Sequence, residues 1–185
     1  MQILIQPILC SSLLENNIIF STLIDHLSKI FEATVTMSFS QKTTVSPPIQ
    51  LFDKDRKQWI SDRILNWLLE INNPNSNTKL LAICDLDAYS DELNFVFGQA
   101  HLGGRVAAIY LPRLREEFYV VTKTDKNMLF QLRVIKEAVH ELGHAFGLRH
   151  CENSKCVMHF SNSLRDTDFK DDKFCQRCNQ IVKGT

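Results

Sequence analysis

The stretch HELGHAFGLRH, residues 140–150, places three histidines and a glycine at spacings that suit a metal site. On a helix, His140 and His144 lie one turn apart and project from the same face, so both imidazoles can reach one ion. Gly147 permits a positive φ, which lets the backbone turn sharply out of the helix. That turn would bring His150 back as a third ligand. The spacing therefore predicts a helix-borne metal site with three imidazole ligands.

Three protein ligands leave a fourth position open for water, which is the arrangement of a catalytic zinc site rather than a structural one. Glu141 follows His140 in sequence and lies about 100° around the helix from it. It can therefore approach a metal-bound water without being a ligand itself. Imidazole ligands also suit other first-row divalent ions, so the prediction of zinc rests on the ligand type. We predict that His140, His144 and His150 hold a catalytic zinc and that Glu141 is the general base.

Four cysteines follow this motif. Cys151 comes directly after His150, Cys156 lies five residues further on, and Cys175 and Cys178 form a CxxC pair. Four thiolates in two close pairs are what a tetrahedral structural zinc site requires. Disulfide bonds are the alternative, and a reducing compartment disfavours them. We therefore predict a second, structural zinc that clamps both ends of the loop after the last histidine.

These motifs resemble those of a known family. HExxHxxGxxH is the signature of metzincin metallopeptidases, which place a methionine turn beneath the metal, and Met158 in CVMHFS lies where that turn should be. With the cysteines of Cx₄CxM and FCxxC added, the pattern is similar to that of archaemetzincins, which combine a metzincin core with a four-cysteine zinc site. The resemblance also covers LNFVFGQAHLGGRVAAIYLPRL (93–114) and CVMHFSNSLRDTD (156–168), roughly the second half of the chain.

The resemblance implies a zinc metallopeptidase that acts on peptide or protein substrates. Zinc would lower the pKa of its bound water toward about 7. Glu141 would take the proton as this water attacks a peptide carbonyl, and would then hand it to the leaving amine. An edge strand, LNFVFGQ (93–99) or its partner RVAAIYL (105–111), would pair with the substrate above the cleft. Met158 and Gly147 would support the site without binding metal.

The remaining pattern predicts an α/β (α+β) fold: a mixed, twisted sheet with packed helices, including the long active-site helix, and a short zinc-clamped C-terminal part. Periodicity predicts strands at 2–9, 34–39, 79–84, 93–99 and 105–111, and helices at 17–31, about 55–71 and about 126–146. Pro7 indicates an edge position or a strand end. We expect one metallopeptidase domain over 1–185, with 1–150 forming the upper part and 151–185 the small part with the methionine turn and the cysteines.

Composition limits the partners. Lys+Arg and Asp+Glu both count 21, and this balance gives no electrostatic reason to expect nucleic acid or an anionic membrane surface. The amino terminus lacks the basic start of a secretory signal, and no apolar run approaches the roughly 18 residues that span a bilayer. We therefore expect a cytoplasmic protein, acting as a monomer, with two Zn²⁺ ions.

Two other interpretations stay open at this point. A zinc-stabilised peptide- or protein-binding module, catalytically weak or inactive, would have the same metals but a blocked or misaligned cleft. The presence of Glu141 favours an enzyme, because pure binding places no demand on a general base. A nucleic-acid-binding zinc ribbon would use the cysteines alone, and the neutral charge together with the adjacency of Cys151 to His150 disfavours it.

Overall fold

A five-stranded sheet forms the centre of the protein, whose computed structural model describes residues 1–10, 18–38, 45–90, 93–115 and 126–184. The strand order is β2-β1-β5-β8-β7. The strands are β1 (Gln2–Ile8), β2 (Thr34–Met37), β5 (Thr78–Cys84), β7 (Gly98–Ala100) and β8 (Val106–Tyr110). All neighbouring pairs are parallel except β7 with β8, which is antiparallel. The sheet is therefore mixed, with β7 at one edge.

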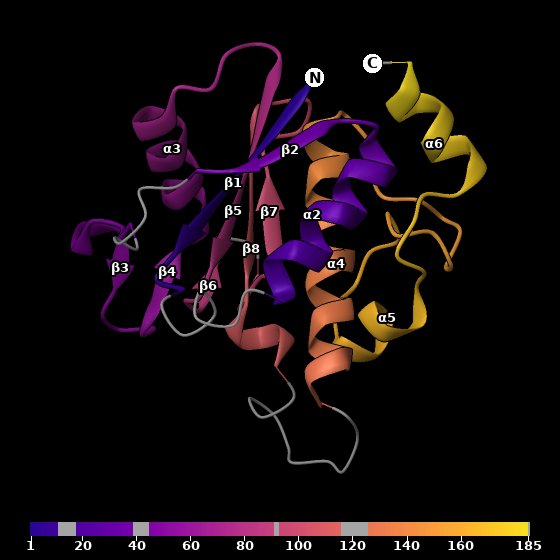
Figure 1. The fold of residues 1–185 in the computed structure, drawn as a ribbon. Helices are drawn as coiled ribbons and strands as arrows, with labels where there is room; N and C mark the ends of the chain where they lie inside the picture. The colour runs from indigo at the N-terminus through magenta and orange to yellow at the C-terminus, as the bar shows by residue number, and fades with distance from the viewer. Residues whose placement is uncertain (11–17, 39–44, 91–92, 116–125, 185) are drawn as a thin grey trace.

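Helices cover both faces of this sheet (Figure 1). Helices α2 (Ile18–Phe31) and α4 (Lys126–Ala145) lie on one face, and α3 (Ser61–Asn72) lies on the other. Side chains of β5 alternate between the two cores: Leu81 packs toward the side of α2 and α4, and Leu80 toward α3. Burial on both faces explains why the central strands read as continuous apolar runs.

The start of the second predicted helix is wrong. Helix α3 begins at Ser61, and the residues before it form a small second sheet of β3 (Phe52–Asp53), β4 (Gln58–Ile60) and β6 (Ala88–Tyr89). The Asp53 carboxylate accepts hydrogen bonds from the backbone N–H groups of Asp55 and Arg56. Such a side-chain turn competes with helix formation. The apolar residues assigned to the first helical turns pair instead with β6.

The strand predicted at 93–99 is mostly absent, because only its last two residues enter β7. The segment before β7 bonds to the small sheet instead: the Val96 N–H donates to the Ala88 carbonyl, and the Gln58 amide donates to the Asn94 carbonyl. Its alternating apolar residues line a cleft and a core rather than the two faces of a strand. Strand β8 lies inside the sheet, so β7 alone is the edge strand expected above the cleft.

The other predicted elements are present, and the α/β fold class is confirmed. Strand β1 is internal, but its pairing with β2 stops at Ile5, so Pro7 lies near the strand end as expected. The tail contains two short helices, α5 (Leu164–Phe169), which lies beside α4, and α6 (Gln176–Lys183) (Figure 1). Residue 17 of the first predicted helix and residue 39 of the second predicted strand lie outside the described part of the chain. Among the described helices, none is long and apolar enough to cross a membrane.

Candidate active site

Helix α4 and the turn after it bring the three histidines together. Ring nitrogens of His140, His144 and His150 all lie within 4.8 Å of one another. Gly147 has a φ of 89°, and its N–H donates to the His144 carbonyl at 2.8 Å, which ends the helix. The chain then reverses and returns His150 to the helix face. The sharp turn predicted at Gly147 is therefore present.

Two carbonyl groups fix which ring nitrogens are free. The Nδ1 atoms of His140 and His144 lie 2.7 Å from the carbonyl oxygens of Val157 and Leu148. Since a carbonyl only accepts, both Nδ1 atoms carry hydrogen, and both Nε2 atoms keep bare lone pairs. These Nε2 atoms are 3.1 Å apart. A tetrahedral zinc with Zn–N bonds of 2.0–2.1 Å separates two nitrogen ligands by about 3.3 Å, so the site fits such an ion.

Burial favours the neutral imidazole form that a metal requires, most of all at His140. It lowers the pKa of His140, His144 and His150, most strongly for His140, whose side chain is almost wholly enclosed. The ammonium of Lys170 lowers the pKa of His140 further. Neutral imidazole is the ligand form, so little proton release is needed for binding.

Glu141, on helix α4, directs its side chain toward the edge of the sheet at β7. Its residue is 5% exposed, and burial, followed by the neighbouring charge of Glu137, raises its pKa. Strand β7 passes so close that a Cβ atom on Gly98 would come within 2.5 Å of the Glu141 Cγ. Gly98 was not among the predicted site residues, although a glycine inside a strand pattern is a known sign of close backbone approach.

The four tail cysteines also converge. The sulfur atoms of Cys151, Cys156, Cys175 and Cys178 lie within 4.8 Å of one another, and those of Cys151 and Cys175 are 3.9 Å apart. This distance is far beyond a disulfide bond. Tetrahedral zinc with Zn–S bonds of about 2.3 Å separates two sulfurs by about 3.8 Å, so the cluster fits that ion.

Backbone donors favour a thiolate within this cluster. Burial raises the pKa of the Cys175 thiol, but hydrogen bonds from the Cys178 backbone and from the neighbouring thiols outweigh it and lower the pKa to about 7. The Cys175 N–H in turn donates to the Cys156 sulfur at 3.3 Å. Because the thiolate is the form that binds metal, Cys175 is the member of the cluster whose thiol is best prepared for a cation.

The loop of residues 151–159 lies beneath helix α4 and is called the floor loop below. The Cys151 N–H donates to the Met158 carbonyl at 2.9 Å, and this hydrogen bond joins the two ends of the loop. Met158 is fully buried, and a Cβ atom on Gly143 would collide with its sulfur. The methionine therefore packs directly against helix α4 at Gly143. No other described cysteine joins either cluster.

A cleft with a volume of about 530 Å³ opens over the histidines. Its polar lining includes Glu137, His140, Glu141, His144, His150, Arg149, Gln99, Ser161 and Asn162, and its apolar lining includes Leu93, Phe95, Val96, Phe97, Leu102 and Phe160. Phe95 and Phe97 pack edge to face, with ring centroids 5.3 Å apart. Both rings therefore serve the cleft wall as well as the core.

The remaining histidines and cysteines belong to neither cluster. The Nδ1 atom of His159 lies 2.9 Å from the Cys151 carbonyl, and His26 bonds to the backbone of residue 172. His101 lies in the turn between β7 and β8. Cys10 and Cys84 are buried, and burial raises the pKa of Cys10 to about 12, so it behaves as a small apolar residue.

Sequence comparison now places the chain in a family. The profile of peptidase family M54 matches residues 12–184. The chain belongs to peptidase family M54. Membership makes it a zinc-dependent metallopeptidase, and peptide or protein substrates follow from the same assignment.

Individual relatives of this M54 chain agree. It is 46% identical to an archaemetzincin of Methanocaldococcus jannaschii over 131 residues, which cover 71% of this chain and 69% of the relative. An archaemetzincin crystal structure from Methanopyrus kandleri superposes with a TM-score of 0.81 at 31% identity, covering 100% of this chain and 94% of the other. One from Archaeoglobus fulgidus, complexed with malonate, gives 0.78 at 35% identity, covering 98% and 99%. The resemblance to archaemetzincins is therefore confirmed.

Proposed function

We propose that this M54 chain hydrolyses peptide bonds in the cleft over α4, with one zinc held by His140, His144 and His150 and with Glu141 as the general base. The observation that carries the proposal is the pair of bare Nε2 atoms, 3.1 Å apart, at the floor of a cleft that also contains a buried carboxylate. Two lone pairs facing each other repel, and a cation between them removes that repulsion.

The chemistry divides between the metal and the chain. When bound, zinc polarises the scissile carbonyl and activates water as a Lewis acid. Glu141 takes the proton of the attacking water and then passes it to the leaving amine, a task that its position at the wall of the cleft suits. The Nδ1 bonds of His140 and His144 to backbone carbonyls keep both rings oriented throughout.

Strand β7 is suited to hold an extended peptide. Backbone hydrogen bonds already join β8 to Phe97 and His101, the residues on either side of β7. Because hydrogen bonding alternates along an antiparallel pair, Gly98 and Ala100 direct their N–H and C=O groups to the open edge. A substrate strand can add there and place its carbonyl beside Glu141.

We propose further that the four cysteines hold a second, structural zinc, which gives two ions per chain. Residues 151–185 would then act with 1–150 as one domain, a view supported by the ion pairs of α4 with the C-terminal part. We also propose that the protein acts as a monomer in the cytoplasm, where a reducing environment suits free cysteines.

Cleavage of a mixed-sequence peptide library tests the function. The native chain is expected to contain two zinc ions by elemental mass spectrometry and to cut a subset of the peptides, as read by mass spectrometry of the products. A chelator that removes the histidine-bound zinc should abolish cleavage, and added zinc should restore it. Cleavage that persists in the metal-free protein, or a zinc-loaded chain that cuts nothing, would contradict the proposal and favour a binding module.

Gly98→Ala is expected to lower kcat by about 10- to 100-fold, because the added methyl group must displace Glu141, and small misplacements of a catalytic group are costly. Zinc content should not change. The matched control is Gly184→Ala, since a Cβ atom there meets nothing closer than 3.4 Å. Steady-state kinetics of both variants provide the comparison, and equal kcat values would show that Glu141 can move without loss.

A further inference from the structure

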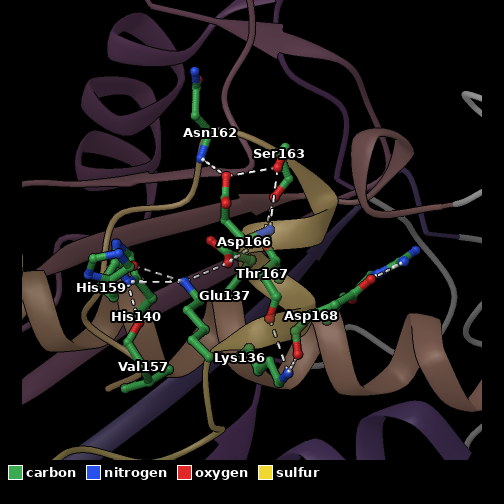
Figure 2. A network of polar contacts seen from close by, with 12 residues as sticks. Lys136, Glu137, His140, Val157, His159, Asn162, Ser163, Asp166, Thr167 and Asp168 are labelled. Atoms are coloured by element: carbon green, nitrogen blue, oxygen red, sulfur yellow. Dashed lines mark hydrogen bonds and ion pairs between the residues drawn. The ribbon is translucent and has the colours of Figure 1, made fainter. Parts of the chain in front are cut away.

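A network of polar contacts joins α4 to the C-terminal part of the chain (Figure 2). Arg133 makes two hydrogen bonds of 2.7 Å to the Asp168 carboxylate. One turn further on, the Lys136 ammonium donates to the carbonyls of Thr167 and Asp168. These contacts attach α4 to α5 at the outer end of the network, where the Asp168 side chain is one-third exposed.

The last contact of the network is different, because it is wholly buried and reaches the histidine site. The Lys170 side chain is 0% exposed and that of its partner Glu137 is 4% exposed, with 3.0 Å between Nζ and Oε1. The same Nζ lies 3.4 Å from the His140 Nδ1 and 3.4 Å from the His159 carbonyl oxygen. One ammonium thus contacts the catalytic helix, a predicted zinc ligand and the cleft floor.

Stability alone does not account for this arrangement. Taking a lysine and a glutamate out of water is costly, and well-packed apolar residues of similar volume are often as stable or more so. Lysine is almost never fully buried without a specific partner. A buried pair of this kind, one turn from Glu141 and beside His140, therefore calls for a role in the site.

The geometry around His140 indicates that role. Its Nδ1 hydrogen is already donated to the Val157 carbonyl, so Lys170 cannot donate to the same atom. Instead, Lys170 holds both supports of that bond: Glu137 lies three residues before His140 on α4, and His159 lies two residues after Val157 on the floor. The ammonium therefore sets the distance between the helix and the floor at the point where the His140 ring is oriented.

We propose that Lys170 is a positioning residue for the zinc ligands, which holds α4 and the floor loop at the spacing that keeps His140 oriented by Val157. This inference rests on the proposed zinc site. It does not require Lys170 to touch substrate or metal. Loss of the ammonium would leave the His140–Val157 bond longer or variable, while the bond of His144 to Leu148, which Lys170 does not contact, would stay.

The test compares Lys170→Met with the double variant Glu137→Gln/Lys170→Met, because the single change leaves a buried unpaired carboxylate and can unfold the protein. In the folded, zinc-loaded double variant, zinc affinity measured against a competing chelator should fall by about 10- to 100-fold. The imidazole ¹H–¹⁵N signal of His140 should shift or broaden while that of His144 is unchanged. We expect kcat of this variant to fall while its KM stays within about twofold of the native value.

The control is Lys183→Met, which breaks an exposed pair with Glu32. It should change neither the zinc affinity, nor the His140 signal, nor kcat.

A double variant with native zinc affinity and a native His140 signal would overturn the inference and make the pair structural only. A fall in melting temperature without these two changes would likewise assign the pair to stability alone. Failure of the zinc site itself is separable, since the native chain would then bind no zinc at the histidines and show no shifted imidazole signals at all.

Discussion

Glu141→Ala is expected to lower kcat/KM by about 100- to 10,000-fold, which is the range that a positioned general base contributes. Zinc content should be unchanged, because Glu141 lies beside the three ligands without belonging to the cluster of ring nitrogens. Its carboxylate lines the cleft, its residue is 5% exposed, and no other described glutamate except Glu137 lines the same cleft. Glu137 is engaged by Lys170, so it cannot substitute.

The measurement is hydrolysis of a peptide found in the library experiment, with metal content determined on the same samples. Glu70→Ala, an exposed glutamate on α3, is the matched control and should behave as the native chain does. If the Glu141 variant lost zinc along with activity, the carboxylate would be supporting the ligands rather than moving protons. Retained activity with full zinc would require a different base.

Cys175→Ser is expected to lower the melting temperature by about 10 °C and to loosen the tail. A structural zinc contributes of order 10 kcal/mol to folding in small domains. Losing about 3 kcal/mol of that would shift the melting temperature of a 150–250-residue protein by roughly 10 °C. The thiol has the lowest pKa of the shifted cluster members, so it is the ligand whose loss should weaken metal binding clearly.

The same variant should also release the histidine-bound zinc more readily. Cys151 follows His150 directly and bonds to the Met158 carbonyl, so disorder at the cysteines reaches the floor of the site. Thermal unfolding and zinc release to a chelator measure the two effects. Arg177→Ser, an exposed neighbour within the CxxC pair, is the control. A Cys175 variant with two zinc ions and native stability would exclude the clamp.

The local chemistry of both clusters was predictable because it depends on spacing within short segments. One helical turn separates His140 from His144, and Gly147 supplies the positive φ that returns His150, so the chain itself dictates the convergence of these rings. The cysteines are harder, because Cys175 lies 24 residues from Cys151. The prediction that these four cysteines share one zinc site rested on the number of ligands and on the family resemblance, not on geometry.

Two predicted elements differ from the structure, and in both of them contacts across the chain outweigh local periodicity. Apolar residues at 93–97 alternate as in a strand, yet their backbone bonds to the small sheet and their side chains line the cleft. The residues before Ser61 carry helical spacing, yet the Asp53 carboxylate bonds to the backbone and starts a hairpin. Periodicity records that a residue is buried but not which partner buries it.

Ligand types, their helical spacing and the family could be read from the amino-acid sequence, because each depends on residues close together or on a motif. Three features required the folded chain: β7 is the edge strand, Gly98 lies against Glu141, and Lys170 lies beneath His140. The cause is distance along the chain, since Lys170 is 30 residues from His140, and the packing of α5 and the floor loop against α4 brings it there. Such packing is set by the whole core, and no pattern within either segment records it.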